Sequence, residues 1–304
     1  MENLFDRQDA ILITGPTASG KSALALKLAH EHDGVVINAD SMQVYDTLRL
    51  LTARPSGDEM QGVPHLLYGH VPAGAAYSTG VWLRDVQALL PQLREEGRLP
   101  VFVGGTGLYF KALTGGLSEM PVVEDTIRQH WRQRLADEGA HALHRLLSER
   151  DPAAALQLTP QDGQRIVRAL EIFEAAGRSI TDFQNRTGPV IVDSARARKY
   201  VVLPERGLLH ARIDRRFDLM LEGGAIGEVE ALLAQKLSPE MPVMKAIGVS
   251  QIAALLRGDM DAETVRATGA AATRQYAKRQ MTWFRNQMDE SWVRLDGADS
   301  QSFR

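Results

Sequence analysis

The sequence predicts an α/β fold in which a parallel sheet, flanked by helices, carries a phosphate-binding loop and is interrupted by a helical domain. Three observations lead to this fold class. A phosphate loop occupies residues 15–22, short apolar runs alternate with helical patterns through the first third of the chain, and strand signals then disappear from about 124 to 180. Alternating strands and helices form mostly parallel sheets, whose ligands bind at the carboxyl ends of the strands.

The phosphate loop reads GPTASGKS, a complete G-x-x-x-x-G-K-[ST] pattern. It follows an apolar run and opens onto a helical sequence over residues 23–29, which is the context that the motif requires. The loop amides can cradle a diphosphate, Lys21 can reach its oxygens and the Ser22 hydroxyl can hold Mg²⁺. Against a chance glycine-rich turn, we expect a phosphate-bearing ligand at Gly15, Pro16, Thr17, Ala18, Ser19, Gly20, Lys21 and Ser22.

Apolar runs predict the strands of the sheet, at residues 11–14, 35–39, 66–70 and 99–103. Between the last two of these, apolar residues at helical spacing predict a helix over 79–96, which Gly97 ends. A further strand is expected at 199–203, and the rest of the chain is mainly helical in character.

A helical domain is expected between the strands. Residues 130–138 and 140–149 have the pattern of a helix pair, Asp162 can cap a helix that runs through Phe173, and Gly177 can end it. We therefore predict a discontinuous catalytic core over 1–117 and 195–304, with a helical insertion over 118–194.

Composition excludes several classes of protein. The 304 residues are 44% hydrophobic and 24% charged, as in an ordinary globular protein, and they include no cysteine. Disulfides, thiolate zinc sites and a catalytic thiol are therefore excluded. No apolar run is long enough to span a membrane and the first residues do not resemble a signal peptide, so we expect a cytoplasmic enzyme. The net charge of −3 implies that any nucleic-acid surface is a local patch.

Two more predicted strands end in polar turns at the same expected edge. Asp40 follows the strand at 35–39, where a carboxylate can hold Mg²⁺ or act as a general base. The alternative is an acid that only stabilises a turn. The sequence GGTGLY over 104–109 follows the strand at 99–103, and its glycines let the backbone approach a ligand closely, with Thr106 offering a hydroxyl. The alternative is a tight turn without a ligand.

Cations gather in two segments that have helical patterns. Arg165 and Arg168 are spaced to share one face. The segment 274–285 has four cations and no acid, with Trp283 and Phe284 between them. Arg274, Lys278 and Arg285 form one stripe along a helix over this segment. Such a stripe binds nucleic acid in some proteins and is a solvated face above an aromatic core in others.

Further cations occur at Arg212, Arg215 and Arg216. One or more can neutralise a diphosphate, and the alternative is ion pairing with nearby acids at helical spacing, namely Asp214, Asp218 and Glu222. His65 enters a predicted strand and is interpreted as structural.

These segments together resemble the bacterial tRNA dimethylallyltransferases, also called tRNA isopentenyltransferases. The matching stretches occur in the family's order over nearly the whole chain: GPTASGKS (15–22), NADSMQVY (38–45), TARP (52–55), VGGTGLYFKAL (103–113), QRIVRALEI (164–172) and TRQYAKRQMTWFR (273–285). The family often has a tyrosine where this chain has Val249, and its eukaryotic members add a zinc finger that a cysteine-free chain cannot form.

The resemblance implies transfer of a dimethylallyl group from its diphosphate to N6 of an adenosine beside the anticodon, position 37 of tRNA. It implies a P-loop NTPase-like fold with a channel, Mg²⁺ at Ser22, catalytic roles for Asp40, Thr106 and Lys21, and a monomer. Arg212 and Arg216 would join the loop in binding diphosphate. The residues that would meet tRNA are Asp40, Ser41, Met42, Gln43, Thr106, Arg128, Gln164, Arg165, Ile166, Val167, Arg168, Lys278, Arg279, Gln280 and Arg285.

Three other functions share part of this pattern. A nucleotide or small-molecule kinase would use the same loop with ATP, a prenyltransferase could act on free AMP or ADP, and a phosphate-loop protein could bind RNA without catalysis. The first two leave the basic segments without a role, and the third leaves Asp40 and Thr106 without one.

Overall fold

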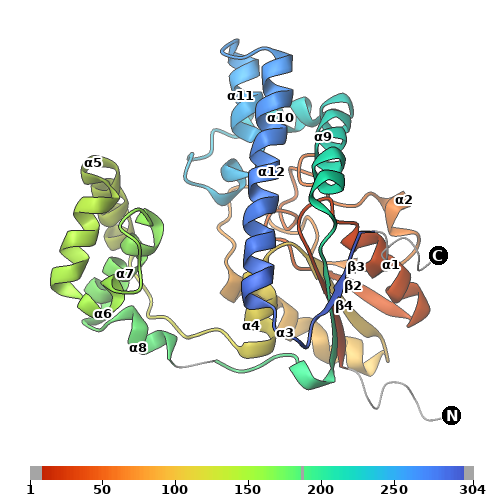
Figure 1. The fold of residues 1–304 in the computed structure, drawn as a ribbon, viewed down its shortest axis with the longest axis horizontal. Coiled ribbons are helices and arrows are strands. Elements are labelled where there is room, and N and C mark those ends of the chain that lie inside the picture. Colours follow the sequence, from red (N-terminus) through yellow and green to blue (C-terminus); the bar gives the residue numbers. More distant parts are fainter. Residues whose placement is uncertain (1–8, 186–187, 298–304) are drawn as a thin grey trace. The chain divides into compact units, whose positions relative to one another are not determined.

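The computed structural model describes residues 9–185 and 188–297, so the N-terminal residues considered above for a signal peptide lie outside it. Figure 1 shows the chain. It divides into two compact units, Met1–Thr114 with Ile191–Arg304, and Gly115–Val190. None of the described helices is both long and apolar enough to cross a membrane.

The described residues of the first unit form a six-stranded parallel sheet in the order β3-β2-β4-β1-β5-β6. The three central strands are wholly buried, which explains why each appears in the sequence as an uninterrupted apolar run. The α/β fold class is therefore confirmed. The strands are β1 (Ala10–Thr14), β2 (Gly34–Asn38), β3 (His65–Leu66), β4 (Leu99–Gly104), β5 (Ala197–Val202) and β6 (Val293–Leu295).

The register of the sheet places the ends of three strands at one edge. Thr14 of β1 lies opposite Gly104 of β4, and Asn38 of β2 lies opposite Val103. The segments that follow these strands are the phosphate loop, the turn at Asp40 and the turn at Thr106, so the sheet brings all three together.

Helices on the sheet build the core of this unit. Leu24 and Ala25 of α1 pack on Val101 and Val103 of β4. The C-terminal helices form a second core with the segment after β2, and α9 and α12 run side by side (Figure 1). The helices are α1 (Lys21–Glu31), α2 (Gly57–Met60), α3 (Thr79–Glu95), α4 (Gly107–Gly115), α9 (Arg206–Glu222), α10 (Ala225–Ala234), α11 (Val249–Arg257) and α12 (Ala262–Gln287), with short helical turns at Ser194–Arg196 and Pro242–Lys245.

The second unit is helical throughout its described residues. Its hydrophobic core includes Trp131, Leu143 and Ile166. As predicted, the side chain of Asp162 caps a helix by accepting a hydrogen bond from the Arg165 amide, and Gly177 ends that helix with φ of 64°. The elements are α5 (Asp125–Arg150), α6 (Pro152–Ala155), α7 (Gly163–Ala176) and α8 (Ile180–Gln184), and α5 is broken at Gly139, where the predicted helix pair meets.

One strand prediction needed correction, and one strand was missed. The strand expected at 66–70 is only His65–Leu66, because Leu67 adopts a left-handed conformation with φ of 61° and ends it. β6 was not predicted, because three residues at a sheet edge with two exposed side chains carry no periodic signal.

Candidate active site

Hydrogen bonds join the three turns at the sheet edge. The Thr106 amide donates to Ala39 O at 3.2 Å, and the Ser41 amide donates to Thr106 Oγ1 at 3.0 Å. Thr14 Oγ1 donates to Gly104 O at 3.1 Å. Main-chain groups and hydroxyls therefore fix the phosphate loop and the two turns relative to one another.

The phosphate loop contains two left-handed residues and lines a cavity. Ala18 and Gly20 adopt left-handed conformations, with φ of 62° and 93°, which curl the loop toward the first turn of α1. The loop lines a cavity of about 610 Å³, together with Arg212 and Arg216. The hydroxyl of Ser19 is buried and has no hydrogen-bond partner among the described residues, so the loop retains a polar group for a ligand.

Lys21 lies in this cavity and donates a hydrogen bond to Pro16 O at 3.2 Å. Burial lowers the pKa of Lys21 to about 8, although the nearby Asp40 carboxylate opposes this shift. A cation that is costly to hold without a partner favours binding of an anion.

Arg216 is the arginine of α9 that reaches the loop. Its guanidinium donates to Thr17 Oγ1. Arg216 lines both the 610 Å³ cavity and a second cavity of about 300 Å³ that also contains Asp40. Arg215 is exposed and lines neither. The predicted alternative of local ion pairing was wrong for Asp214 and Asp218, because these acids pair with Arg274 and Arg266 of α12.

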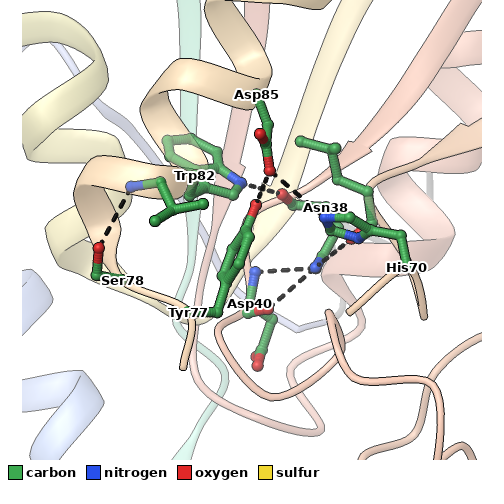
Figure 2. Close-up of polar contacts among 9 residues, drawn as sticks. Asn38, Asp40, His70, Tyr77, Ser78, Trp82 and Asp85 are labelled. Atoms are coloured by element: carbon green, nitrogen blue, oxygen red, sulfur yellow. Dashed lines mark hydrogen bonds and ion pairs between the residues drawn. The ribbon is translucent and has the colours of Figure 1, made fainter. Parts of the chain in front are cut away.

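Asp40 is held by a network that centres on Asn38 (Figure 2). The Asn38 amide accepts from the Asp40 N–H at 2.9 Å and donates to Asp40 O at 3.0 Å. Trp82 in turn donates from Nε1 to Asn38 O at 2.8 Å. Asn38 is fully buried, so this hydrogen-bond network is rigid and fixes the turn that carries Asp40.

The two oxygens of Asp40 have different surroundings. Oδ1 accepts a hydrogen bond from the Met42 amide at 3.0 Å, as expected of a turn-stabilising acid. Oδ2 lies toward Gly105, where an added Cβ would be 3.3 Å away. The turn role and a chemical role for Asp40 are therefore compatible, one for each oxygen.

Three tyrosines are influenced by the charge of Asp40. The pKa values of Tyr68, Tyr109 and Tyr276 are raised by burial and, secondarily, by the Asp40 carboxylate. Tyr109 stacks on Trp82 with ring centroids 4.3 Å apart. Burial therefore favours the neutral form of these phenols near the carboxylate, and none of the three was predicted as a site residue.

The glycines of the second turn serve packing. An added Cβ on Gly104 would lie 2.0 Å from Ala39 O, and one on Gly107 would lie 2.1 Å from the Trp283 ring. On Gly105 it would lie 2.3 Å from Gln280 Nε2. The turn therefore approaches β2 and α12 closely. Gly105 and Gly107 also line a cavity of about 240 Å³ with Thr106, so a ligand at this turn stays a prediction.

Two smaller cavities meet Asp40 and Thr106. One, of about 300 Å³, has Asp40, Thr17 and Arg216 on its polar side. The other, of about 240 Å³, is lined by Thr106 and Trp283, and the two share Tyr276 and Arg279. The apolar side of the first cavity is formed by Met42, Leu51, Phe217, Met220, Ala246 and Ile247.

The other predicted site residues of the sheet unit differ in whether their side chains are accessible to a substrate. Lys278, Arg279 and Arg285 are exposed on α12, whereas Gln280 is buried there, so the expectation that it contacts tRNA needs correction. Ser41 and Met42 line the 300 Å³ cavity. Gln43 donates both amide hydrogens to the carbonyls of Thr52 and Ala53, at 2.9 and 3.0 Å, which leaves only its oxygen for a base.

In the helical unit, some of the residues on α7 that were predicted to contact RNA are exposed and others are buried. Gln164 and Arg165 are exposed, and Arg165 lies 3.4 Å from Asp162. Ile166 and Val167 lie in the core of the unit, so their side chains are not available to RNA and this expectation needs correction. Arg168 donates to the buried Glu171 at 3.1 Å, and Arg128 of α5 lies 3.8 Å from Asp125.

Val249, the departure from the family pattern, is buried in the core between α9–α12 and the segment after β2. It lines none of the cavities described above, so the exchange leaves their walls unchanged.

The donor set at the loop suits a magnesium ion that a diphosphate brings with it. Within 9–185 and 188–297, no three acidic or histidine side chains gather as a metal site. Ser22 lines the 610 Å³ cavity. Mg²⁺ commonly takes one or two protein ligands with phosphate oxygens and water, so Ser22 fits this group.

Comparisons with known proteins identify relatives over nearly the full chain. Residues 43–287 match the family model described as IPP transferase, and residues 8–69 match one described as isopentenyl transferase. The tRNA dimethylallyltransferases of Rhizobium johnstonii and Rhizobium meliloti are 70% and 67% identical, covering 97% and 99% of this chain and 99% of each relative.

Two solved structures are similar to this chain over nearly its full length. The tRNA isopentenylpyrophosphate transferase of Bacillus halodurans has a TM-score of 0.68 at 32% identity, over 97% of this chain and 94% of that one. A eukaryotic dimethylallyltransferase acting on tRNA has a TM-score of 0.80 at 27% identity, over 97% of this chain and 75% of that one.

Proposed function

The chain belongs to the IPP transferase family, and we propose on this premise that it is a tRNA dimethylallyltransferase. It transfers a dimethylallyl group from dimethylallyl diphosphate to N6 of adenosine 37 in tRNA and releases diphosphate. The observation that carries the proposal is the meeting of the phosphate loop, Asp40 and Thr106 at one edge of the sheet, against a helix with exposed cations.

The donor diphosphate occupies the 610 Å³ cavity, where the loop amides, Lys21 and Arg216 face its oxygens. As the bond between the allylic carbon and oxygen breaks, the electron pair leaves with diphosphate and negative charge grows there. Fixed cations and amides stabilise such charge more in the transition state than in the ground state. Mg²⁺ held at Ser22 adds charge neutralisation when it is bound.

The acceptor needs a base because its exocyclic amine is a poor nucleophile. The N6 nitrogen forms the new bond to the allylic carbon, and one of its protons passes to Oδ2 of Asp40. Thr106 lies beside this position, and the amide of Ser41 orients its hydroxyl. The dimethylallyl group lies against the apolar side of the 300 Å³ cavity.

The adenine leaves the anticodon stack to reach this point. Lys278, Arg279 and Arg285 on α12 bind anticodon phosphates, and Gln164 and Arg165 of the helical unit do the same from α7. Because tRNA is used in the cytoplasm, the proposal includes a cytoplasmic enzyme, acting as a monomer with Mg²⁺.

One incubation distinguishes this function from its alternatives. The purified protein receives dimethylallyl diphosphate with unmodified tRNA or AMP, and separately ATP with each acceptor. Mass analysis of tRNA nucleosides should reveal prenylated adenosine, with AMP unmodified and ATP not consumed. Prenylated AMP would instead identify an enzyme of free nucleotides, and phosphate transfer from ATP would identify a kinase.

A further inference from the structure

We propose that Gln280 is a positioning residue that couples the donor loop to the tRNA-facing helix. The side chain is 6% exposed, although it is polar and lies on α12 among apolar neighbours. Its Oε1 accepts from the Thr17 N–H at 3.0 Å, and its Nε2 donates to Gly105 O at 2.9 Å. One amide therefore joins α12 to the phosphate loop and to the turn that carries Thr106. This inference rests on the proposed function.

The surroundings of Gln280 are shaped for this amide. Any side chain on Gly105 would meet Gln280 Nε2, so the glycine admits the hydrogen bond. Removal of the Gln280 amide would leave the Thr17 N–H and the Gly105 carbonyl buried without partners. The free-energy cost of leaving them unpaired exceeds the net stabilisation that their hydrogen bonds provide. The arrangement is therefore a fixed connection between three segments rather than a chance contact.

The connection controls Thr17 from two sides. Gln280 holds the main-chain amide of Thr17, and Arg216 donates to its hydroxyl. Thr17 immediately precedes the part of the loop that faces the diphosphate, and Arg216 faces the same cavity. Loss of Gln280 releases the amide side of this clamp and lets the loop and Arg216 leave the geometry that binds diphosphate.

The same helical turn presents side chains toward the acceptor. Arg279 precedes Gln280 in sequence, Trp283 follows one turn later, and both line the cavity that contains Thr106. An RNA that orders this part of α12 therefore also orders the donor loop. Coupling of this kind is reciprocal, so a bound donor must raise the affinity for tRNA by the factor by which tRNA raises the affinity for donor.

The test compares Gln280→Met, which removes both hydrogen bonds at similar volume, with Gln280→Glu. Gln235→Met, at an exposed glutamine after α10, is the matched control. Binding of the unreactive thiolo analogue of dimethylallyl diphosphate is measured without tRNA, and tRNA binding is measured with and without the analogue. Melting temperatures of all variants are recorded, and wild-type prenylation of tRNA is measured first.

We expect Gln280→Met to bind the analogue about tenfold more weakly, to keep its affinity for tRNA alone and to lose the gain in tRNA affinity that the analogue gives. Gln280→Glu, when ionised, accepts from Thr17 but cannot donate to Gly105 and adds negative charge beside the donor. When protonated, it can make both hydrogen bonds. Its affinity for the analogue should therefore recover as the pH falls from 7 to 5, whereas that of Gln280→Met should not.

Two results would overturn the inference while wild-type prenylation stands. One is a lower melting temperature in both variants with unchanged analogue affinity and unchanged coupling, which makes Gln280 a packing residue. The other is a uniform loss of tRNA affinity with unchanged analogue affinity, which makes Gln280 a support of the tRNA-facing helix alone. Absence of wild-type prenylation would instead refute the proposed function.

Discussion

At the scale of single residues, Asp40 divides its roles between its two carboxylate oxygens. One holds the turn through Met42, and the other faces the reacting amine in the proposed reaction. Asn at this position keeps an oxygen for the Met42 amide but cannot accept the proton. We expect Asp40→Asn to lower kcat by about 10²–10⁴-fold, the usual contribution of a general base, without weakening tRNA binding, or donor binding at a pH where Lys21 is charged.

Single-turnover prenylation with saturating donor and tRNA measures this effect, and Asp40→Ala tests it without the amide. Should Asp40→Asn retain more than about a tenth of the wild-type rate, Asp40 would not be the base, since general bases contribute far more than that.

Lys21 gives the donor site a pH dependence. Burial lowers the pKa of Lys21 to about 8, so the ammonium is charged below this pH and becomes neutral above it. Donor binding needs the charge. The kcat/KM for dimethylallyl diphosphate should therefore fall as the pH rises through about 8, while tRNA affinity shows no inflection there.

Two variants check the assignment. Lys21→Ala should lower kcat/KM for the donor and abolish the inflection. Asp40 raises the pKa of Lys21, so Asp40→Asn should move the residual inflection to lower pH. An inflection that persists in Lys21→Ala belongs to another group.

Sequence motifs predicted those residues of the site that directly follow strands. Asp40 and Thr106 could be placed at the sheet edge because each comes shortly after an apolar run, and Lys21 because the phosphate-loop motif fixes its place between a strand and a helix. Gln280 and Asn38 could not be assigned their roles, because the hydrogen bonds of the Gln280 amide to Thr17 and Gly105, and those of Asn38 beyond Asp40, reach distant segments. One signal was present for Gln280, a polar residue between Ala277 and Met281 on the inner face of a helix.

At the scale of elements, the second glycine turn and α12 fit one another. Gly107 opens α4 where the Trp283 ring lies, and an added methyl would be 2.1 Å from it. We expect Gly107→Ala to destabilise the fold by about 1–3 kcal/mol, as overpacking does, and to weaken tRNA binding because Trp283 and its helix move.

Thermal unfolding and tRNA binding measure this change. Gly227→Ala in α10 is the control, since nothing lies within 4 Å of the added methyl. There the substitution should stabilise by about 0.5–1 kcal/mol, because a helical glycine is entropically costly. Equal effects of the two substitutions would show that Trp283 does not occupy this position.

The elements also show where sequence patterns end. Buried parallel strands were predicted from uninterrupted apolar runs, and amphipathic helices from apolar residues at helical spacing. The end of β3 depends on the left-handed conformation of Leu67, a residue that rarely adopts it, and β6 depends on pairing with β5. Both are decided by the assembled sheet rather than by local sequence.

At the scale of the whole molecule, a chain of net charge −3 must bind a polyanion through local cations. The structure distinguishes cations that sequence spacing treats alike. Lys278 is exposed and Arg165 is 75% exposed, whereas Arg168 is paired with the buried Glu171. The first two are expected to serve RNA binding, and Arg168 also stabilises the helical unit.

This distinction predicts different results for three alanine variants. Lys278→Ala and Arg165→Ala should each weaken tRNA binding and reduce the slope of log K against log salt by about 0.7–0.9, the value for one phosphate contact, with unchanged melting temperature. Arg168→Ala should in addition lower the melting temperature, because it leaves the Glu171 carboxylate buried without its partner. Donor binding should be unchanged in all three, since the phosphate loop contains none of these residues. Filter binding across a salt series measures the slopes. Slopes equal to that of the parent in all three variants would mean that these cations only solvate helix faces, and that RNA binds elsewhere on the molecule.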